Sequence, residues 1–388
     1  MKTVLVFRRA LLPMSETFVR QQALGLRDWE ATLVGHHFVT DGLDLSGLRA
    51  QLVSGGENGL FRRLGWLAFS KVGWPVPVGV RALDQLDAEL IHVHFATDAV
   101  AAWPWLRRLH LPVVVTLHGY DINTHPEWWI AGNGGHRQRR YPSRLRALSR
   151  EPRVSFIAVS EAIRQRAMTA FDIPANKIEV LHIGVDNTVF VPGPIMIGHR
   201  APKVLFVGRL VEKKAPDVLI HAMQQVQRSI PAAELVVIGD GPLRQRSEQL
   251  ALDLKVNARF MGAQPNSVVR QMMDETRVFC LPSITAANGD AEGLPISVLE
   301  AQACGVPVVT SAVGGRDEGI RDGVTGFAFA EGDHAALAGH LLKLLTDDVL
   351  ATDMGLKATR HIAERFSLAD CTRALERRYG RIANDATT

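Results

Sequence analysis

The sequence predicts an α/β fold built from two doubly wound domains. Three observations carry this prediction. The length of 388 residues suits about two domains, short β-branched runs alternate with longer amphipathic segments, and one Pro- and Gly-rich stretch lies near the middle of the chain. The hydrophobic fraction of 47% indicates a globular rather than a disordered chain.

Short runs rich in Val, Ile and Leu are the candidate strands. In the first half they are residues 3–7, 31–35, 90–95, 112–119, 155–160 and 178–184. In the second half they are residues 203–209, 234–240, 258–262, 277–283 and 307–311. Amphipathic segments between these runs are the candidate helices, for example residues 215–228, 242–254 and 295–304.

A linker is predicted at residues 187–203, because "NTVFVPGPIMIGHRAPK" holds three prolines and two glycines. We therefore assign residues 1–190 to an N-terminal domain and residues 200–365 to a C-terminal domain. The amphipathic segment 366–388 is expected to form a helix that crosses back to the first domain. Two such domains are expected to face a central cleft, with ligands at the carboxyl ends of the strands.

Charge and cysteine content narrow the class of protein. Lys and Arg number 44 against 40 Asp and Glu, and the net charge of +4 suits anionic ligands or a membrane surface without requiring nucleic acid. The 3 cysteines are scattered and form no disulfide or metal-ligand pattern. The apolar run in "MKTVLVFRRA" is too short for a signal peptide, and no run reaches the ~18 residues of a membrane span. We therefore expect a cytoplasmic protein.

Two cations, Arg209 and Lys214, stand between the strand "KVLFVGR" and the helix that follows it. Arginine offers a planar fork to phosphate oxygens, lysine a mobile charge, and the helix start a partial positive charge. We therefore predict an anion-binding site here. The alternative is a solvated loop with an ion pair to Glu212.

A second loop, "VVIGDGPL", carries Gly239 and Gly241 on either side of an aspartate. It matches only part of a G-x-G-x-x-G pattern, so it indicates dinucleotide binding weakly. A tight turn from strand to helix explains the two glycines at least as well.

The stretch "GDAEGLPISVLEAQACGVPVV" places Glu292 before a helix start and Glu300 inside an apolar helix. Proline at position 295 suits the first helical position, so the amides of Gly293, Leu294 and Ile296 form a second anion-binding end. Glu292 is placed to accept hydrogen bonds from sugar hydroxyls, and Glu300 from the two hydroxyls of a ribose. A carboxylate in so apolar a segment needs donors; for Glu300 the alternative partner is a neighbouring arginine.

In the first half, "VTLHGYD" places His118 at a strand end, where it can donate to a sugar hydroxyl or stabilise developing charge. The alternative is a hydrogen-bonded packing histidine. Asp121 and the segment "LLPMSETF" supply candidates for contact with an acceptor. There Ser15 is predicted to cap a helix, with Glu16 and Thr17 in its first turn.

The segment 134–153 carries seven arginines, and tryptophans occur in "EWW" (127–129), in "WPW" (103–105) and at Trp66 and Trp74. Basic and aromatic side chains together suit an anionic membrane surface and a lipid-diphosphate acceptor. The alternative is a solvated basic helix with ordinary tryptophan burial.

The motifs together resemble a family 4 retaining glycosyltransferase with the GT-B fold. The resemblance runs through "SETF", "THGYD", "AVSEAIR", "IGVD", "VGRLVEKK", "IGDGP", "EGLPISVLEAQACGVPVVTSAVGG" and "DGVTGF". The pair of glutamates Glu292 and Glu300, eight positions apart in an E-x7-E motif, is specific in combination with Arg209 and Lys214. "SETFV", "HVHFATDAV" and "THGYDI" are similar to bacterial exopolysaccharide and colanic-acid-type transferases.

This resemblance implies transfer of a hexose, with retained configuration, from a nucleoside-diphosphate sugar (UDP- or GDP-linked) to a saccharide acceptor, which is expected to be carried on a lipid diphosphate. Arg209 and Lys214 would hold the donor diphosphate, Glu292 the transferred sugar and Glu300 the ribose. The amides of residues 293–296 would contact sugar or phosphate, although Pro295 has none to offer. His118 would lie beside the transferred sugar. The acceptor would belong to exopolysaccharide or lipopolysaccharide synthesis.

Metal-dependent transferases often hold the diphosphate through a D-x-D triplet, and this sequence contains none. We therefore expect protein cations to replace a metal ion, and no cofactor. Two other classes remain open at this point: a nucleotide-sugar epimerase of the same fold, and a catalytically silent nucleotide-sugar-binding protein.

Overall fold

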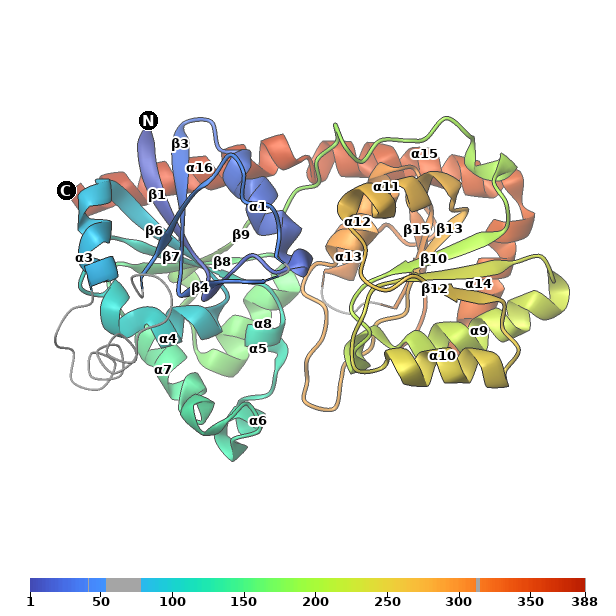
Figure 1. Ribbon diagram of the computed structural model, residues 1–388, viewed down its shortest axis with the longest axis horizontal. Coiled ribbons are helices and arrows are strands. Elements are labelled where there is room, and N and C mark those ends of the chain that lie inside the picture. Colours follow the sequence, from blue (N-terminus) through green and yellow to red (C-terminus); the bar gives the residue numbers. More distant parts are fainter. Residues whose placement is uncertain (41, 54–77, 312–314, 388) are drawn as a thin grey trace. The chain divides into compact units, whose positions relative to one another are not determined.

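The computed structural model describes residues 1–40, 42–53, 78–311 and 315–387. The chain divides into two compact units, of which unit 1 comprises Met1–Gly184 with Leu368–Thr388, and unit 2 comprises Val185–Ser367. Each unit is a parallel β-sheet with helices on both faces (Figure 1). The predicted fold class, two doubly wound α/β domains, is confirmed.

The division between the units falls before the expected linker. Residues 187–203 pack within unit 2, where the Arg270 guanidinium donates to the carbonyls of Val189 and Val191 at 2.8 and 2.7 Å. The Val185 amide donates to the carbonyl of Phe366 at 2.7 Å, so the two ends of unit 2 meet.

Unit 1 is organised around one sheet in the described part of the chain. Its seven strands pair in parallel in the order β5-β3-β1-β6-β7-β8-β9. They are β1 (Lys2–Phe7), β3 (Trp29–Gly35), β5 (Arg49–Leu52), β6 (Ala88–His94), β7 (Val113–Leu117), β8 (Val154–Ala158) and β9 (Ile178–Val180). A separate pair is formed by β2 (Ala10–Leu11) and β4 (His37–Phe38). The central strands β1, β6 and β7 are almost wholly buried, which explains their continuous runs of Val, Leu and Ile.

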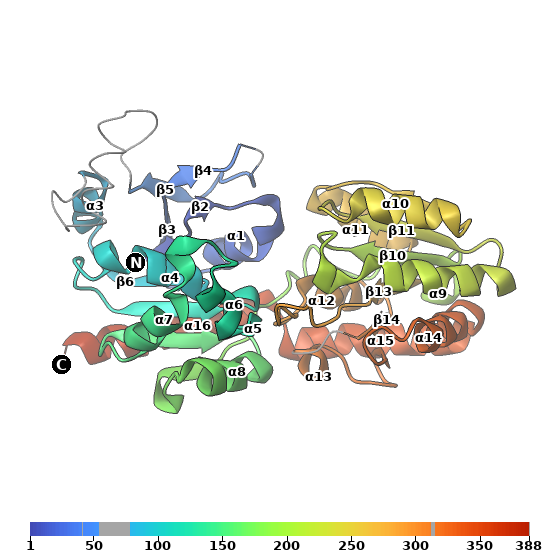
Figure 2. The same cartoon turned by 90° about the horizontal axis from the view of Figure 1, so that it is seen from below.

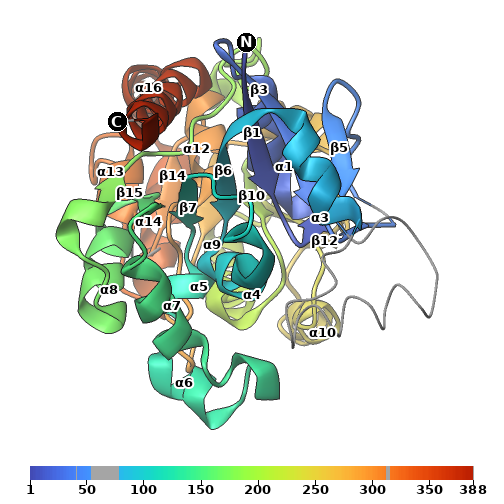
Figure 3. The same cartoon turned by 90° about the vertical axis from the view of Figure 1, so that its left-hand side faces the viewer.

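Helices cover both faces of the unit 1 sheet. One core lies between β1, β3, α1 (Thr17–Leu24) and the C-terminal helix α16 (Leu368–Thr387), and it includes Trp29, Leu375 and Tyr379. The opposite side carries α4 (Ala96–Leu106), α5 (Tyr120–Asn123), α6 (Pro126–Ala131), α7 (Tyr141–Ser149) and α8 (Glu161–Phe171). Figure 3 shows α6 and α7 on the side of the sheet away from α16. The helix α3 (Val78–Leu83) precedes β6.

Unit 2 repeats this plan with six strands among its described residues, in the order β12-β11-β10-β13-β14-β15. They are β10 (Lys203–Val207), β11 (Glu234–Ile238), β12 (Ala258–Phe260), β13 (Val278–Leu281), β14 (Val308–Thr310) and β15 (Gly326–Ala328). One face carries α9 (Pro216–Ser229), α10 (Arg244–Asp253) and α14 (His334–Thr346); the other carries α11 (Asn266–Glu275), α12 (Ile296–Ala303) and α15 (Asp348–Arg365) (Figure 1). The short α13 (Arg316–Gly319) follows β14, and α9 and α10 lie side by side (Figure 2).

Two strands of the two large sheets, β5 and β15, were not predicted from the sequence, and neither was the short pair of β2 and β4. The strand β5 has the sequence "RAQL" with exposed or half-buried side chains, and β15 has only three residues. Both are edge strands. An edge strand buries fewer side chains than a central one, so the apolar signal used for the prediction is weak there.

Candidate functional site

The carboxyl end of β10 carries Arg209, whose loop is fixed by the neighbouring glycine loop. The amide of Leu210 donates to the carbonyl of Asp240 at 2.9 Å, and that of Gly208 to the carbonyl of Ile238 at 3.0 Å. A Cβ atom at Gly239 would lie 1.9 Å from the Gly208 carbonyl oxygen. This close approach accounts for the glycine, as the turn interpretation expected. The Arg209 side chain is exposed and has no ion pair within the described residues, so the alternative pair with Glu212 is not formed.

Lys214 and Glu292, both predicted site residues, contact each other. The Nζ of Lys214 lies 2.9 Å from the Oε1 of Glu292, and the two side chains are 13% and 8% exposed. The hydroxyl of Ser283 donates to the same oxygen at 3.1 Å. Burial by itself would raise the pKa of Glu292, but Lys214, Lys213 and these hydrogen bonds outweigh it and lower the pKa. The carboxylate is therefore ionised at neutral pH.

The neighbouring pair of Lys213 and Asp290 was not predicted. The Nζ of Lys213 lies 3.0 Å from the Oδ1 of Asp290, and both side chains are largely buried. Burial opposes the charge of Lys213, yet Glu292 and Asp290 raise its pKa. The only sequence signal was a second lysine in "VEKK" and an aspartate two residues before Glu292.

The helix α12 begins one residue later than expected, at Ile296, with Pro295 before it in an extended conformation. Gly293 and Leu294 are buried and form the approach to this helix. The Gly293 carbonyl accepts a hydrogen bond of 2.8 Å from the amide of Gly315. A Cβ atom at Gly315 would lie 2.5 Å from that carbonyl oxygen, so the loop after β14 needs glycine there.

Glu300 lies on α12 and is only 7% exposed. Within the described part of the chain its carboxylate forms no ion pair and no hydrogen bond, so the alternative arginine partner is absent. Burial raises its pKa from 4.5 to about 7. The carboxyl group is thus a buried acceptor that receives no hydrogen bond from the part of the chain that the structure describes.

In unit 1, His118 follows β7 and contacts a second histidine. The Nε2 of His118 lies 3.0 Å from the Nδ1 of His94, with the rings stacked at 5.2 Å. Phe95 covers the His118 ring at 4.4 Å. Burial, and then the charge of Arg8, lower the pKa of His118 well below its usual value, so the ring is neutral. His118 is a half-buried, hydrogen-bonded histidine, as the packing alternative expects.

The "SETF" segment differs from its expected geometry. Ser15 lies inside a short 3-10 helix (Met14–Glu16) and makes no cap, and α1 begins at Thr17 without a side-chain cap. Ser15 is exposed and Thr17 half-buried. The predicted Ser15 N-cap is therefore wrong, because the extra helical turn places Glu16, not Ser15, before the first residue of α1.

Glu16 is buried and held by Arg8, a residue that sequence reasoning missed. The Nε of Arg8 donates to a Glu16 carboxylate oxygen at 2.8 Å, and its Nη1 forms an ion pair with Asp98. The Arg8 guanidinium also lies 4.3 Å from the Phe95 ring centre. Glu16 is thus occupied by this network rather than presented to an acceptor.

Asp121 is also occupied, since it is fully buried. Its carboxylate accepts hydrogen bonds from the amides of Ala96, His118 and Gly119 at 2.8, 3.2 and 3.0 Å. It therefore fixes the loop that carries His118 instead of facing an acceptor.

The arginine-rich segment forms a 3-10 turn at His136–Gln138 and α7. Six of its seven arginines are exposed: residues 137, 139, 140, 144, 146 and 150. Arg146 forms an ion pair with Asp172, and the Arg153 guanidinium lies over the ring of Trp103.

Of the tryptophans noted in the sequence, Trp129 is fully buried, whereas its neighbour Ile130 is 58% exposed. Trp66 and Trp74 lie outside the described residues.

The described ranges offer few other ligand positions. No group of three or more His, Cys, Asp or Glu side chains there could hold a metal ion. No described helix is long and apolar enough to cross a membrane.

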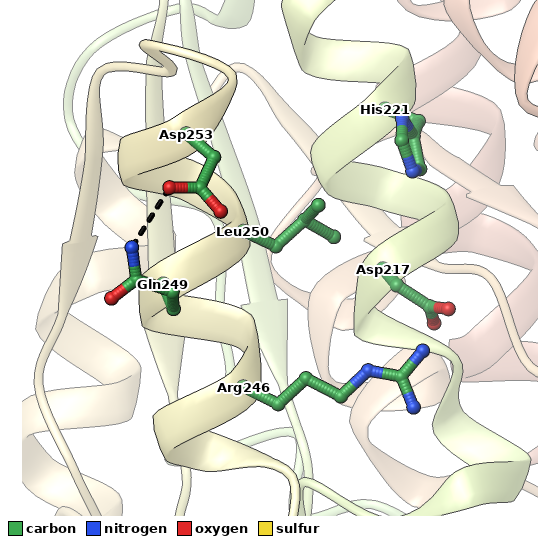
Figure 4. Close-up of a pocket in the computed structure, with 6 residues that line it drawn as sticks. All are labelled: Asp217, His221, Arg246, Gln249, Leu250 and Asp253. Carbon is green, nitrogen blue, oxygen red and sulfur yellow. Dashed lines mark hydrogen bonds between the residues drawn. The ribbon is translucent and has the colours of Figure 1, made fainter.

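A pocket of about 300 Å³ lies between α9 and α10, lined by Asp217, His221, Arg246, Gln249, Leu250 and Asp253 (Figure 4). None of these six was predicted as a site residue, and their mixed charges do not define a ligand.

Family models match both halves of the chain. Residues 15–189 match the model "Glycosyltransferase Family 4", and residues 195–361 match "Glycosyl transferases group 1". The fold and the two matches define the chain as a GT-B glycosyltransferase, as the motifs indicated. It consists of a family 4 glycosyltransferase domain followed by a group 1 glycosyl transferase domain.

Named relatives are similar over part of their length. The amylovoran biosynthesis glycosyltransferase AmsK of Erwinia amylovora is 33% identical over 52% of this chain and 50% of its own. The GDP-mannose-dependent α-(1-6)-phosphatidylinositol monomannoside mannosyltransferase of Mycolicibacterium smegmatis is 36% identical over 53% of this chain and 56% of its own. The chain thus spans about half the length of these relatives. The crystal structure of Anabaena HepE with UDP and glucose has the same fold, with a TM-score of 0.78, 19% identity and coverage of 98% and 100%.

Proposed function

We propose that this protein transfers a hexose from a nucleoside-diphosphate sugar to a saccharide acceptor with retention of configuration. The observation that carries the proposal is the buried pair of Lys214 and Glu292, which follows β10 and precedes α12 in unit 2. Arg209 stands exposed on the same loop as Lys214. An anion site and an ionised acid within 2.9 Å of each other suit a ligand in which phosphate adjoins a sugar.

Each residue takes one task in this proposal. Arg209, Lys214 and the amides at the start of α12 stabilise the negative charge that develops on the departing diphosphate. Glu292 accepts hydrogen bonds from hydroxyls of the transferred sugar, and Glu300 accepts two from the ribose. When the donor binds, its phosphate oxygens compete with Glu292 for Lys214.

The transfer itself breaks the bond from the anomeric carbon to the diphosphate oxygen and forms one to the acceptor oxygen. For retention, the acceptor attacks from the face that the diphosphate leaves, and a phosphate oxygen takes the proton of the acceptor hydroxyl. In this scheme, neutral His118 contributes a hydrogen bond beside the transferred sugar. No covalent link to Glu292 is required.

The donor and acceptor classes draw support from the relatives. HepE was crystallised with UDP and glucose, and the M. smegmatis relative is named for GDP-mannose, so we propose a UDP- or GDP-linked hexose. That relative is also named for a phosphatidylinositol monomannoside acceptor, and AmsK for amylovoran synthesis. We infer a lipid-linked saccharide acceptor in the synthesis of an exopolysaccharide or lipopolysaccharide. The enzyme then works in the cytoplasm, peripherally at the inner face of the membrane.

The absence of a D-x-D triplet supports a reaction without a metal ion, in which Arg209 and Lys214 balance the diphosphate charge. Chelator added to a purified, active enzyme should leave the rate unchanged. A strict requirement for a divalent cation would overturn this part of the proposal.

The function is tested by incubating the protein with UDP- and GDP-sugars, with and without saccharide acceptors. Thermal stabilisation by the matching nucleoside diphosphate identifies the base, and NMR of the product gives the anomeric configuration. Acceptor-dependent transfer with retention is expected. Conversion of the donor to an isomeric sugar without acceptor, or binding without any turnover, would contradict the proposal.

A further inference from the structure

The turn Glu212–Lys214 contacts the loop 284–292 at four separate points. The Lys213 carbonyl accepts from the Ile284 amide at 2.8 Å, and the Glu212 carboxylate accepts from the Ala287 amide at 3.0 Å. The side chains of Lys213 and Lys214 then pair with Asp290 and Glu292, at 3.0 and 2.9 Å. Each residue of the turn thus contacts a different part of the loop.

Asp290 also closes a tight turn within that loop. Its carbonyl accepts from the amide of Ala286 and its amide donates to the side chain of Asn288, each at 2.9 Å. Gly289 between them has φ +86°, which an L side chain rarely adopts. Because Glu292 follows two residues later, a displacement of Asp290 would be passed on to Glu292.

The ion pair of Lys213 and Asp290 is largely buried, so the loss of either partner leaves an unpaired charge that destabilises the loop. The two side chains are 19% and 17% exposed, and a largely buried charge without its partner is unfavourable. Lys213 also lowers the pKa of Glu292, although less than Lys214 does. Removing Lys213 therefore loosens the loop and removes a positive charge from the neighbourhood of Glu292.

We propose that Lys213 and Asp290 are a positioning pair for sugar transfer, which holds the 284–292 loop so that Glu292 stays opposite Lys214. Neither residue is assigned a contact with the donor. The proposal rests on the proposed function, because it needs Lys214 and Glu292 to act on the nucleotide sugar.

The test compares Lys213→Gln, Asp290→Asn, the double variant and Lys213→Arg as full-length proteins. Each single neutral variant should lower kcat by roughly 10- to 100-fold, since small displacements of reacting groups have effects of that order, while the dissociation constant of the nucleoside diphosphate changes less than about threefold. The double variant should lose no more than the worse single one, because the two act as one unit. Lys213→Arg should recover activity to within about threefold of the wild type, because it keeps the charge.

The pH profile separates positioning from general damage. In Lys213→Gln the acidic limb of the kcat profile should move to higher pH, because Glu292 loses a cation that favours its ionised form. Lys357→Gln, which breaks the exposed pair with Asp353 on α15, is the control and should behave as wild type. If Lys213→Gln has the kcat of the wild type and the acidic limb of its kcat profile lies at the same pH, this inference is wrong, while the proposed function stands. A wild type that neither binds nucleoside diphosphates nor turns over any donor would overturn the proposed function and the inference with it.

Discussion

The ammonium group of Lys214 and the carboxylate of Glu292 form an ion pair of 2.9 Å. The two residues stand 78 positions apart in the sequence, and each was predicted to bind a different part of the same ligand. Their pairing neutralises both charges, and in the proposed function an anionic donor competes with Glu292 for the lysine. Breaking a largely buried pair from one side costs more than removing both partners.

Lys214→Ala and Glu292→Ala should each lower kcat by orders of magnitude, because the diphosphate charge or the sugar hydroxyls lose their partner. Each should also lower the free energy of unfolding, by roughly 3–5 kcal/mol if the remaining charge stays buried. The combined Lys214→Met and Glu292→Gln variant should be more stable than either, but equally inactive. Turnover assays and urea denaturation measure both effects. Full activity of Lys214→Ala would refute the assignment.

The Glu300 carboxyl should make stability fall as pH rises. Its pKa is 4.5 when exposed and about 7 in the folded state, because burial disfavours the charge. Between these values the native state holds a proton that the unfolded state has released, so the free energy of unfolding declines by about 3 kcal/mol in total and then levels off. Glu300→Gln should lack this decline. Identical pH dependence of urea denaturation in the wild type and Glu300→Gln would contradict the prediction.

The contact from His94 Nδ1 to His118 Nε2 predicts that His94 orients the His118 ring. His118→Ala should lower kcat by roughly 100-fold if the ring stabilises developing charge. His94→Phe should have a smaller effect, about tenfold, and His94→Asn a smaller one still, because its amide keeps a hydrogen-bonding group near the position of Nδ1. Steady-state kinetics with a saturating donor would reveal this order. Equal losses in both His94 variants would indicate a packing role instead.

The exposed arginines of the 134–153 segment predict binding to anionic vesicles. We expect the partition coefficient onto anionic vesicles, measured by sedimentation, to fall at least tenfold when Arg137, Arg140, Arg144 and Arg150 are changed to Gln. Each basic side chain near an anionic membrane surface contributes about 1 kcal/mol to binding.

A matched control for the vesicle experiment lies in unit 2. The same change of charge at Arg228, Arg246, Lys255 and Arg259, all exposed, should leave vesicle binding intact. Raised salt should weaken binding of the wild type. Equal, negligible binding of the wild type to anionic and neutral vesicles would remove the membrane proposal.

Most of the architecture was predictable because parallel strands covered on both faces carry continuous apolar runs. The strands β1, β6, β10 and β13 were all predicted from such runs, whereas the edge strands β5 and β15 contain few apolar residues in sequence. The helix N-cap predicted at Ser15 is wrong because of local backbone geometry. Whether a serine caps a helix depends on where the backbone enters the helical conformation, and here a short 3-10 turn shifts the cap position of α1 by one residue, from Ser15 to Glu16.

The sequence by itself determined the two-domain α/β class and the residue types at the carboxyl ends of the strands, because apolar periodicity and motif spacing are properties of neighbouring residues. Only the tertiary structure decided which charges meet. Lys213 with Asp290, Lys214 with Glu292, and Arg8 with Glu16 and Asp98 are paired within hydrogen-bonding distance. Glu300 lacks such a partner among the described residues. These ion pairs join residues from 8 to 90 positions apart, and their formation depends on distances in the folded chain that the linear sequence does not contain.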